Sequence, residues 1–523
     1  MPKKRLPDTS SFRKIREHGF LYVDKTPWIY KMLTQGELYF LSRPRRFGKS
    51  LTISTLKELF SGNKELFKGL YIYDKWEFEK YPVLVFDFNE INFETKEKLE
   101  KELKEKILLF ARNYDLKVEG SSVISLFVSL LTGLYKKYRN QVVVLVDEYD
   151  KPIVEHLGKG EEGLKRAIEN RELLENFFGV LKGESVVDVL KFVFVTGVSA
   201  FAKVSIFSKW NNLNNITISP HYAEFLGYTE EEIFKYFAEY LGDFCKAQGF
   251  KDMDECMEMI RYWYNGYRFS PWKDVRVYNP VSIMRAFTEG YFSNWWFETG
   301  TPSFLVNLLK TGNYYIPRFE ELEVTTSFIS AYELEDIPIE ALLFQTGYLT
   351  IKEFDGREFI RLGYPNIEVK KSFSEILLRK IYRAGPGTRK LADELGKALL
   401  REDWQEVKEI FNEILAEIPY PLYTKADEKF FHTVFYLCLN LLGYDARSEV
   451  LSSRGRCDVA VTYRGKAFVI EFKAGVSAEE AIKQIEERGY AKRYQAKGYK
   501  VVKVGVSFDV GERLVKEVVG KTH

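Results

Sequence analysis

The chain has 523 residues, of which 46% are hydrophobic and 29% are charged, and its formal net charge is +2. This composition excludes a largely disordered protein, and no apolar run approaches the roughly 18–20 residues that a membrane-spanning helix needs. The basic N-terminus leads into charged residues, and the four cysteines contain no Cys-x-x-Cys pair. We therefore expect a cytoplasmic chain with no membrane partner, signal peptide, disulfide framework or thiolate zinc site.

The N-terminal part of the chain alternates between strand-like and helix-like segments. Short apolar runs that are rich in β-branched residues and bounded by polar ones are typical of buried parallel strands. They are Leu38–Ser42, Val83–Phe88, Val142–Val146 and Phe192–Thr196, and Leu51–Phe60 has helical spacing. The alternation predicts an α/β domain with a parallel sheet over residues 1–220.

Two further regions differ from the first. Residues 221–419 contain long helical stretches and many aromatic residues, which predict a mostly helical lid or linker. Residues 420–523 read as a third domain, in the order helix (427–442), three strands (446–451, 458–463, 467–473), helix (478–497) and strand (501–508). This third domain carries 18 Lys and Arg against 13 Asp and Glu, an excess that favours contact with nucleic acid.

A phosphate-binding loop is predicted where the first strand gives way to a helix. Residues 43–50 (RPRRFGKS) end in the Gly48-Lys49-Ser50 of a Walker A loop. Lys49 would reach the β- and γ-phosphates of ATP, and Ser50 would ligate Mg²⁺. Arg43 stands where the motif has its first glycine, so the loop is expected to turn differently. The other expected contacts in or beside the loop are Arg45, Arg46, Phe47 and Leu51. The alternative is a chance Gly-Lys-Ser at a helix start.

A Walker B strand is predicted further along. The apolar run Val142–Val146 leads into Asp147, which would hold Mg²⁺, and Glu148, which would orient or deprotonate the water that attacks ATP. Thr196 ends another strand, where it would either sense the γ-phosphate or cap the strand. Two solvated acids at a strand end are the alternative for Asp147 and Glu148, but the two motifs in this order favour nucleotide binding.

A second site is predicted in the C-terminal region. Pairing of two neighbouring strands would bring Asp458 near Glu471, and the two-residue period puts Glu471 and Lys473 on one face. Two adjacent carboxylates suit a hard cation such as Mg²⁺, and Lys473 would steady the charge on a scissile phosphate. Glu428 on the preceding helix and Gln484 on the following helix would assist. The alternative is a salt-bridged hairpin that faces solvent.

Eight short segments carry a family resemblance. They are residues 22–26 (YVDKT), 43–50, 146–152 (VDEYDKP), 196–199 (TGVS), 264–268 (YNGYR), 278–280 (YNP), 344–350 (FQTGYLT) and 364–366 (YPN). Together they resemble the prokaryotic AAA-ATPase-like family, whose own pattern lacks the Walker A glycine. The C-terminal segment is similar to the PD-(D/E)XK nuclease superfamily, although Cys457 stands where the motif has proline.

The resemblance implies a P-loop ATPase core with an AAA/ASCE-like parallel sheet, a helical linker and a restriction-endonuclease-like domain. Residue by residue, it matches the nucleotide site to Lys49, Ser50, Asp147 and Glu148 and the nuclease motif to Asp458, Glu471 and Lys473, with Glu428 and Gln484 as auxiliaries.

These features predict a protein that binds and hydrolyses ATP and is coupled to a Mg²⁺-dependent phosphodiesterase, with DNA favoured over RNA as its partner. Defence or DNA repair would suit such an enzyme. Two alternatives stay open: a nucleotide-gated switch whose nuclease-like domain only binds, and an ATPase that remodels DNA without cutting it. A homo-oligomer is a further expectation, because P-loop ATPases often need a neighbour's arginine and the sequence identifies none.

Overall fold

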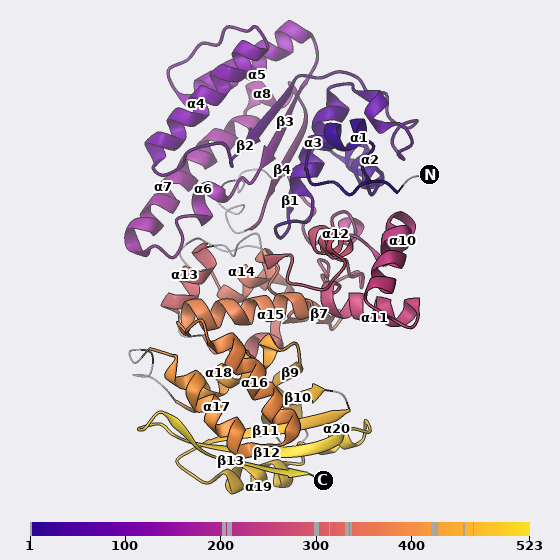
Figure 1. The fold of residues 1–523 in the computed structure, drawn as a ribbon. Coiled ribbons are helices and arrows are strands. Elements are labelled where there is room, and N and C mark those ends of the chain that lie inside the picture. The colour runs from indigo at the N-terminus through magenta and orange to yellow at the C-terminus, as the bar shows by residue number, and fades with distance from the viewer. Residues whose placement is uncertain are drawn as a thin grey trace. The chain divides into compact units, whose positions relative to one another are not determined.

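The computed structural model describes residues 3–200, 206, 212–297, 303–312, 314–329, 334, 337–419, 422, 427–452, 455–463 and 465–522. The chain divides into two compact units (Figure 1). The first unit comprises residues 1–308 and 323–366, and the second comprises residues 309–322 and 367–523. Within the described residues, every helix is too short or too polar to cross a membrane.

A five-stranded parallel sheet forms the centre of the first unit, in the order β2-β3-β4-β1-β5. Its strands are β1 (Leu38–Ser42), β2 (Val83–Asp87), β3 (Val142–Asp147), β4 (Leu190–Gly197) and β5 (Asn214–Asn215). Every residue of β3 is buried, as expected for a central parallel strand that is covered on both faces. The four predicted strands are confirmed. The two residues of β5 are both asparagine, so this strand lacks the apolar pattern that identified the others.

Helices cover both faces of this sheet (Figure 1). On one side lie α1 (Phe12–Glu17), α2 (Thr26–Gln35) and α3 (Lys49–Phe60), and on the other lie α4 (Lys96–Asn113), α5 (Val123–Tyr138) and α7 (Gly160–Gly179). Aromatic rings pack between the sheet and the helices α5 and α7. Phe127 of α5 stacks on Phe177 of α7, and Phe86 of β2 contacts both rings edge-on. The α/β layering places the carboxyl ends of the strands at one edge, where ligands bind in open parallel sheets.

The predicted helical character of the middle region is confirmed. α10 (Glu230–Ala247), α11 (Met253–Tyr264) and α12 (Pro280–Glu289) share one apolar core, which also contains Leu21 and Val23 from the N-terminal segment. Further along are α13 (Ser303–Thr311), α14 (Ile339–Thr346) and a small sheet of β6 (Leu322–Thr325), β8 (Phe359–Gly363) and β7 (Thr350–Phe354), which the sequence did not predict.

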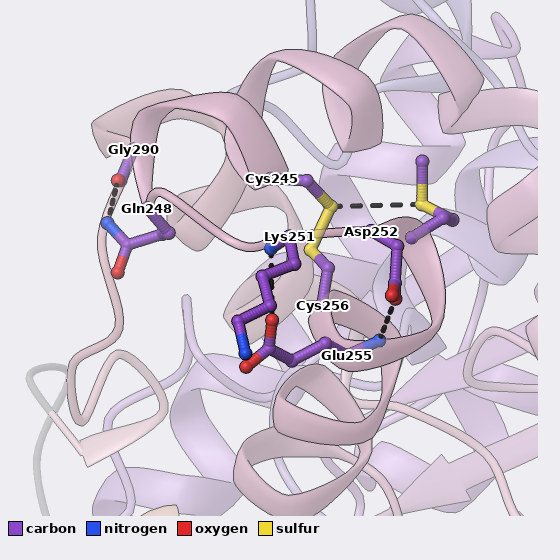
Figure 2. Close-up of a disulfide and its surroundings, with 8 residues drawn as sticks. Cys245, Gln248, Lys251, Asp252, Glu255, Cys256 and Gly290 are labelled. Carbon is purple, nitrogen blue, oxygen red and sulfur yellow. Dashed lines mark hydrogen bonds between the residues drawn. A yellow bond between two sulfur atoms is a disulfide. The ribbon is translucent and has the colours of Figure 1, made fainter.

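A disulfide joins Cys245 near the end of α10 to Cys256 in the first turn of α11, with 5.6 Å between the Cα atoms (Figure 2). The expectation that the cysteines form no disulfides was therefore wrong for this pair. Cysteine spacing did not identify it, because the two residues meet only when the chain reverses between the helices. The other two cysteines, Cys438 and Cys457, are buried and free.

Reduction of this disulfide should destabilise the first unit. Closing a loop of this length contributes about 2–3 kcal/mol by restricting the unfolded chain. We expect a reducing agent to lower the thermal midpoint of the wild-type chain by a few degrees in scanning calorimetry. The double variant Cys245→Ala, Cys256→Ala should unfold at the lower midpoint with or without reductant. A wild-type midpoint that ignores the reductant would contradict this prediction.

The second unit contains a five-stranded sheet in the order β13-β12-β11-β10-β9. Its strands are β9 (Asp445–Ser452), β10 (Gly455–Tyr463), β11 (Lys466–Ala474), β12 (Lys500–Asp509) and β13 (Leu514–Thr522). Neighbouring strands are antiparallel except β11 and β12, which run parallel. The predicted order of helix and strands is therefore found as far as β12, and β13 extends the sheet beyond the prediction.

Helices also pack on both faces of the second sheet (Figure 1). α17 (Trp404–Ala416) and α18 (Glu428–Leu441) lie on one face, α16 (Thr388–Arg401) packs on both of them, and α19 (Ala478–Arg488) covers the other face. The helix predicted over 478–497 is divided into α19 and α20 (Lys492–Gln495). The division occurs because Gly489, at a left-handed φ of 66°, ends α19.

Candidate nucleotide and nuclease sites

The loop between β1 and α3 has the local conformation of a phosphate-binding loop. Arg46 and Gly48 both adopt left-handed φ values, 71° and 95°, and α3 begins directly at Lys49. Gly48 has no side chain that could cap α3, so it leaves the first N–H groups of this helix available to a ligand. N–H groups at a helix start, together with the positive end of the helix dipole, favour bound phosphate.

Lys49 connects this loop to the end of the neighbouring strand β3. Its ammonium group is buried, 3.0 Å from the carbonyl oxygen of Arg43 and 3.7 Å from Oε1 of Glu148. The structure thus brings the Walker A lysine and the Walker B glutamate together, although 98 residues separate them in the chain.

The predicted Mg²⁺ ligands are also adjacent. The Ser50 hydroxyl donates a hydrogen bond to the Asp147 carboxylate. Burial, followed by the charge of Glu148, raises the pKa of Asp147 to about 6. Glu148 itself has a left-handed φ of 53°, a conformation that is rare for non-glycine residues and recurs at functional sites. A buried carboxylate with a raised pKa would be stabilised by a cation, so the donor set fits Mg²⁺.

Two more acids at this edge were not among the predicted site residues. Asp87, the last residue of β2, is paired in register with Asp147. Asp150 is fully buried, where burial raises its pKa, and it accepts hydrogen bonds from the Ser199 hydroxyl at 2.5 Å and N–H at 2.7 Å. The position of Asp87 at the end of a strand could have identified it from the sequence. Asp150 could not be identified in this way, because its partner Ser199 lies 49 positions further along the chain.

The other predicted nucleotide contacts have different environments. The Thr196 hydroxyl donates to the carbonyl oxygen of Leu41 at 2.7 Å, so this side chain already has a partner inside the sheet. Phe47 is buried. Solvent reaches three residues at least in part: Arg45, Arg46 and Leu51. Direct contact between these residues and a nucleotide stays a prediction.

In the second unit, Asp458 on β10 and Glu471 on β11 lie side by side. The Asp458 N–H donates to Oε2 of Glu471 at 3.4 Å, and the N–H of Phe472 donates to Oδ2 of Asp458 at 2.8 Å. The Lys473 ammonium lies 3.3 Å from Oε1 of Glu471, and the Gln484 side-chain amide donates to the same oxygen. The hairpin and α19 therefore bring together four of the five predicted residues through direct hydrogen bonds.

Burial and mutual repulsion raise the pKa values of these carboxyl groups. Burial and then the charge of Glu471 raise the pKa of Asp458 well above its ordinary range. Burial raises the pKa of Glu471 to about 7 against the opposing effect of Lys473. The fifth predicted residue, Glu428 at the start of α18, is half-buried, and burial raises its pKa as well. For Lys473, burial lowers the pKa, but the three carboxylates outweigh burial and raise the pKa overall.

A divalent cation would relieve the repulsion between these carboxyl groups and favour their ionised forms. In the described part of the chain, no group of three or more His, Cys, Asp or Glu side chains is arranged to hold a metal. Mg²⁺ does not require such a group, because it commonly takes one or two protein carboxylates and fills its other positions with water or substrate phosphate. The oxygen donors of Asp458 and Glu471 fit that requirement.

His432 is a supporting residue that was not among the predicted site residues. It lies on α18, its Nδ1 is 2.6 Å from the Tyr315 hydroxyl, and its ring stacks on Phe472. Burial lowers its pKa to about 3, while a hydrogen bond to the backbone of Asp458 opposes that shift. The histidine is therefore neutral at physiological pH and fixes the strand that carries Asp458.

Comparison with known proteins finds an ATPase-like domain and a nuclease-like domain in the regions that carry these two clusters. Residues 8–207 match the family model described as a predicted AAA-ATPase, and residues 426–518 match that of the PD-(D/E)XK nuclease superfamily. An uncharacterized protein in the vnfD 5′ region of Azotobacter chroococcum is 37% identical over 527 residues, which cover 98% of each chain. The chain belongs to the predicted AAA-ATPase family with a C-terminal PD-(D/E)XK nuclease-superfamily domain, which confirms the resemblance inferred from the motifs.

Proposed function

We propose that this protein is an ATPase coupled to a Mg²⁺-dependent nuclease that cuts DNA. The observation that carries the proposal is the buried pair of carboxylates, Asp458 and Glu471, with Lys473 and Gln484 bonded to it. When bound there, Mg²⁺ would polarise the scissile phosphate and lower the pKa of a coordinated water. The excess of basic residues after residue 419 supports a nucleic acid as the partner.

Each residue of the nuclease site has a proposed role. Asp458 and Glu471 hold the cation, and Gln484 fixes the orientation of the Glu471 carboxylate. Lys473 keeps its charge, because its pKa is raised, and stabilises the negative charge that develops on the phosphate. Glu428, whose pKa is also raised, accepts a proton from water.

At the nucleotide site, Lys49 exchanges its contact with the Arg43 carbonyl for the β- and γ-phosphates of ATP. Ser50 and Asp147 hold the Mg²⁺ of the nucleotide, and Glu148 orients or deprotonates the attacking water. We further propose that residues 1–220 form the ATPase core, residues 221–419 relay its state, and residues 420–523 form the nuclease. The pairing of the two domains supports a cytoplasmic role in defence or DNA repair. A second copy of the chain would supply an arginine for hydrolysis.

A cleavage panel tests the proposal. Single- and double-stranded DNA and RNA are incubated with Mg²⁺ or Mn²⁺, with and without ATP, beside the variant Asp458→Ala and the control Glu480→Ala, an exposed acid of α19. We expect DNA cutting that needs the metal, is lost in Asp458→Ala and persists in Glu480→Ala, with ATP turnover similar in all three proteins. Cutting that survives Asp458→Ala would refute the site. ATP binding without any cutting would favour the switch that only binds.

A further inference from the structure

We propose that Arg43 and four buried side chains from residues 267–296 form a positioning clamp on the phosphate-binding loop, so that ATP binding depends on this distant segment. The four are Tyr267, Phe269, Asn279 and Trp296. The inference rests on the proposed ATP binding at Lys49 and assigns a role to three features that this proposed function does not use: the arginine that replaces the Walker A glycine, and the segments YNGYR and YNP.

The Arg43 side chain points into the protein interior. Only 1% of its surface is exposed, and its guanidinium donates to the carbonyl oxygens of Ser42, Thr217 and Tyr222. The guanidinium also lies 4.2 Å from the centre of the Phe269 ring, a favourable cation–π distance. Burial lowers the pKa of Arg43 to about 9, so the group remains charged at neutral pH. A glycine here would leave these carbonyl oxygens without their shared donor.

The same ring, Phe269, also contacts the other end of the loop. The ring centre of Phe47 lies 5.2 Å from that of Phe269 and 4.8 Å from that of Tyr267, and all three rings are buried. Phe269 therefore touches the loop at two residues, Arg43 and Phe47, which lie on either side of the peptide groups expected to face phosphate. Edge-to-face ring pairs of this kind fix orientation as well as burying surface.

Between those two contacts, the carbonyl of Arg45 is held by two donors. The Asn279 amide lies 3.5 Å from it and the Trp296 indole N–H lies 3.4 Å from it. None of the described residues follows a cis peptide bond, so this carbonyl and the N–H of Arg46 point in opposite directions. Holding the carbonyl against Asn279 and Trp296 therefore aims the Arg46 N–H away from the clamp, where a phosphate oxygen would accept from it.

A coupling follows from this geometry. If the clamp stabilises the conformation of the loop that binds ATP, bound ATP must stabilise the clamp by the same factor. ATP binding would thus stabilise residues 267–296. These residues are distant in the sequence, since Asn279 and Trp296 lie 234 and 251 positions after Arg45.

Binding of a fluorescent ATP analogue to the full chain tests the clamp. Arg43→Gly restores the glycine of the motif, Arg43→Lys keeps the charge but loses the planar fork, and Trp296→Phe keeps a ring but loses the donor. We expect at least tenfold weaker binding for both Arg43 variants and about threefold to tenfold weaker binding for Trp296→Phe. The matched control is Arg16→Lys, because Arg16 also donates to two backbone carbonyls, those of Leu66 and Lys68, and should leave the affinity unchanged.

Hydrogen exchange gives a second readout that general destabilisation would not reproduce. ATP should slow exchange across residues 267–296 in the wild type and in Arg16→Lys, and should do so much less in the clamp variants. A folded Arg43→Gly that binds ATP like the wild type would overturn the inference. If Arg43→Gly does not fold, wild-type affinity in both Trp296→Phe and Phe269→Leu would overturn it instead. Failure of the wild type itself to bind ATP would refute the proposed ATPase function.

Discussion

Glu471→Gln should abolish nucleic-acid cleavage and, at the same time, make the metal-free protein more stable above pH 7. The amide keeps the shape of the side chain but carries no charge to hold a cation, so we expect cleavage to fall at least about a thousandfold. The stability gain follows from burial, which leaves Glu471 1% exposed and raises its pKa from the ordinary 4.5 to about 7.

The sign of the pH dependence follows from proton binding. Between pH 4.5 and 7 the unfolded chain has already released the Glu471 proton while the folded chain still holds it, so the stability of the folded state falls as the pH rises. Glutamine does not titrate, so the variant lacks this loss, which is on the order of 3 kcal/mol for a shift from 4.5 to about 7.

Urea unfolding from pH 4 to 8, in EDTA and then in Mg²⁺, measures both effects. Without metal, the wild type should become steadily less stable than Glu471→Gln as the pH approaches 7, and added Mg²⁺ should restore only the wild type. Glu480→Gln on the exposed face of α19 is the matched control and should follow the wild type throughout. A Glu471→Gln protein that is less stable than the wild type at pH 7.5 in EDTA would contradict the prediction.

Lys49→Ala should lose ATP binding, whereas Glu148→Gln should bind ATP and fail to hydrolyse it. Lys49 is the buried cation 3.7 Å from Glu148, so its removal leaves Asp147 and Glu148 facing a phosphate chain without compensation. We expect binding to weaken by about a hundredfold or more in Lys49→Ala. Glu148→Gln keeps the geometry but loses the base, so turnover should fall about a hundredfold to ten-thousandfold with nearly unchanged affinity.

Binding and steady-state turnover separate the two variants. Lys57→Ala, an exposed lysine on the same helix α3, is the control for the loss of a positive charge and should behave like the wild type. If cutting depends on bound ATP, Glu148→Gln should still cut in ATP and Lys49→Ala should not. Threefold weaker binding or less in Lys49→Ala would show that the loop does not hold phosphate as proposed.

The elements that could be predicted are those whose signal is local. β3 was recognisable because a fully buried parallel strand is a continuous apolar run, and the Asp458 hairpin because period-two spacing puts Glu471 and Lys473 on one face. Both acidic sites follow directly from strand ends or strand pairs, so a few neighbouring residues were enough to propose them.

The features that escaped prediction depend on distant contacts. The sequence identified Arg43 as the residue that replaces the Walker A glycine but did not identify its partners Thr217, Tyr222 and Phe269, because they come near it only in the folded chain. The same holds for the disulfide between Cys245 and Cys256. β5 was missed because an edge strand of two asparagines carries no apolar pattern to detect.

The contacts of Arg45 with Asn279 and Trp296 also set the order in which the protein can be completed during translation. Trp296 leaves the ribosome 251 residues after Arg45, a delay of roughly 10–50 s at the usual rate of synthesis. Until then, the emerging N-terminal sheet lacks the rings that cover Phe47 and the donors that hold the loop. On the proposed clamp, the N-terminal sheet therefore completes its phosphate-binding loop only after residue 296 has emerged, and chains that terminate earlier would expose an unfinished loop to chaperones and proteases.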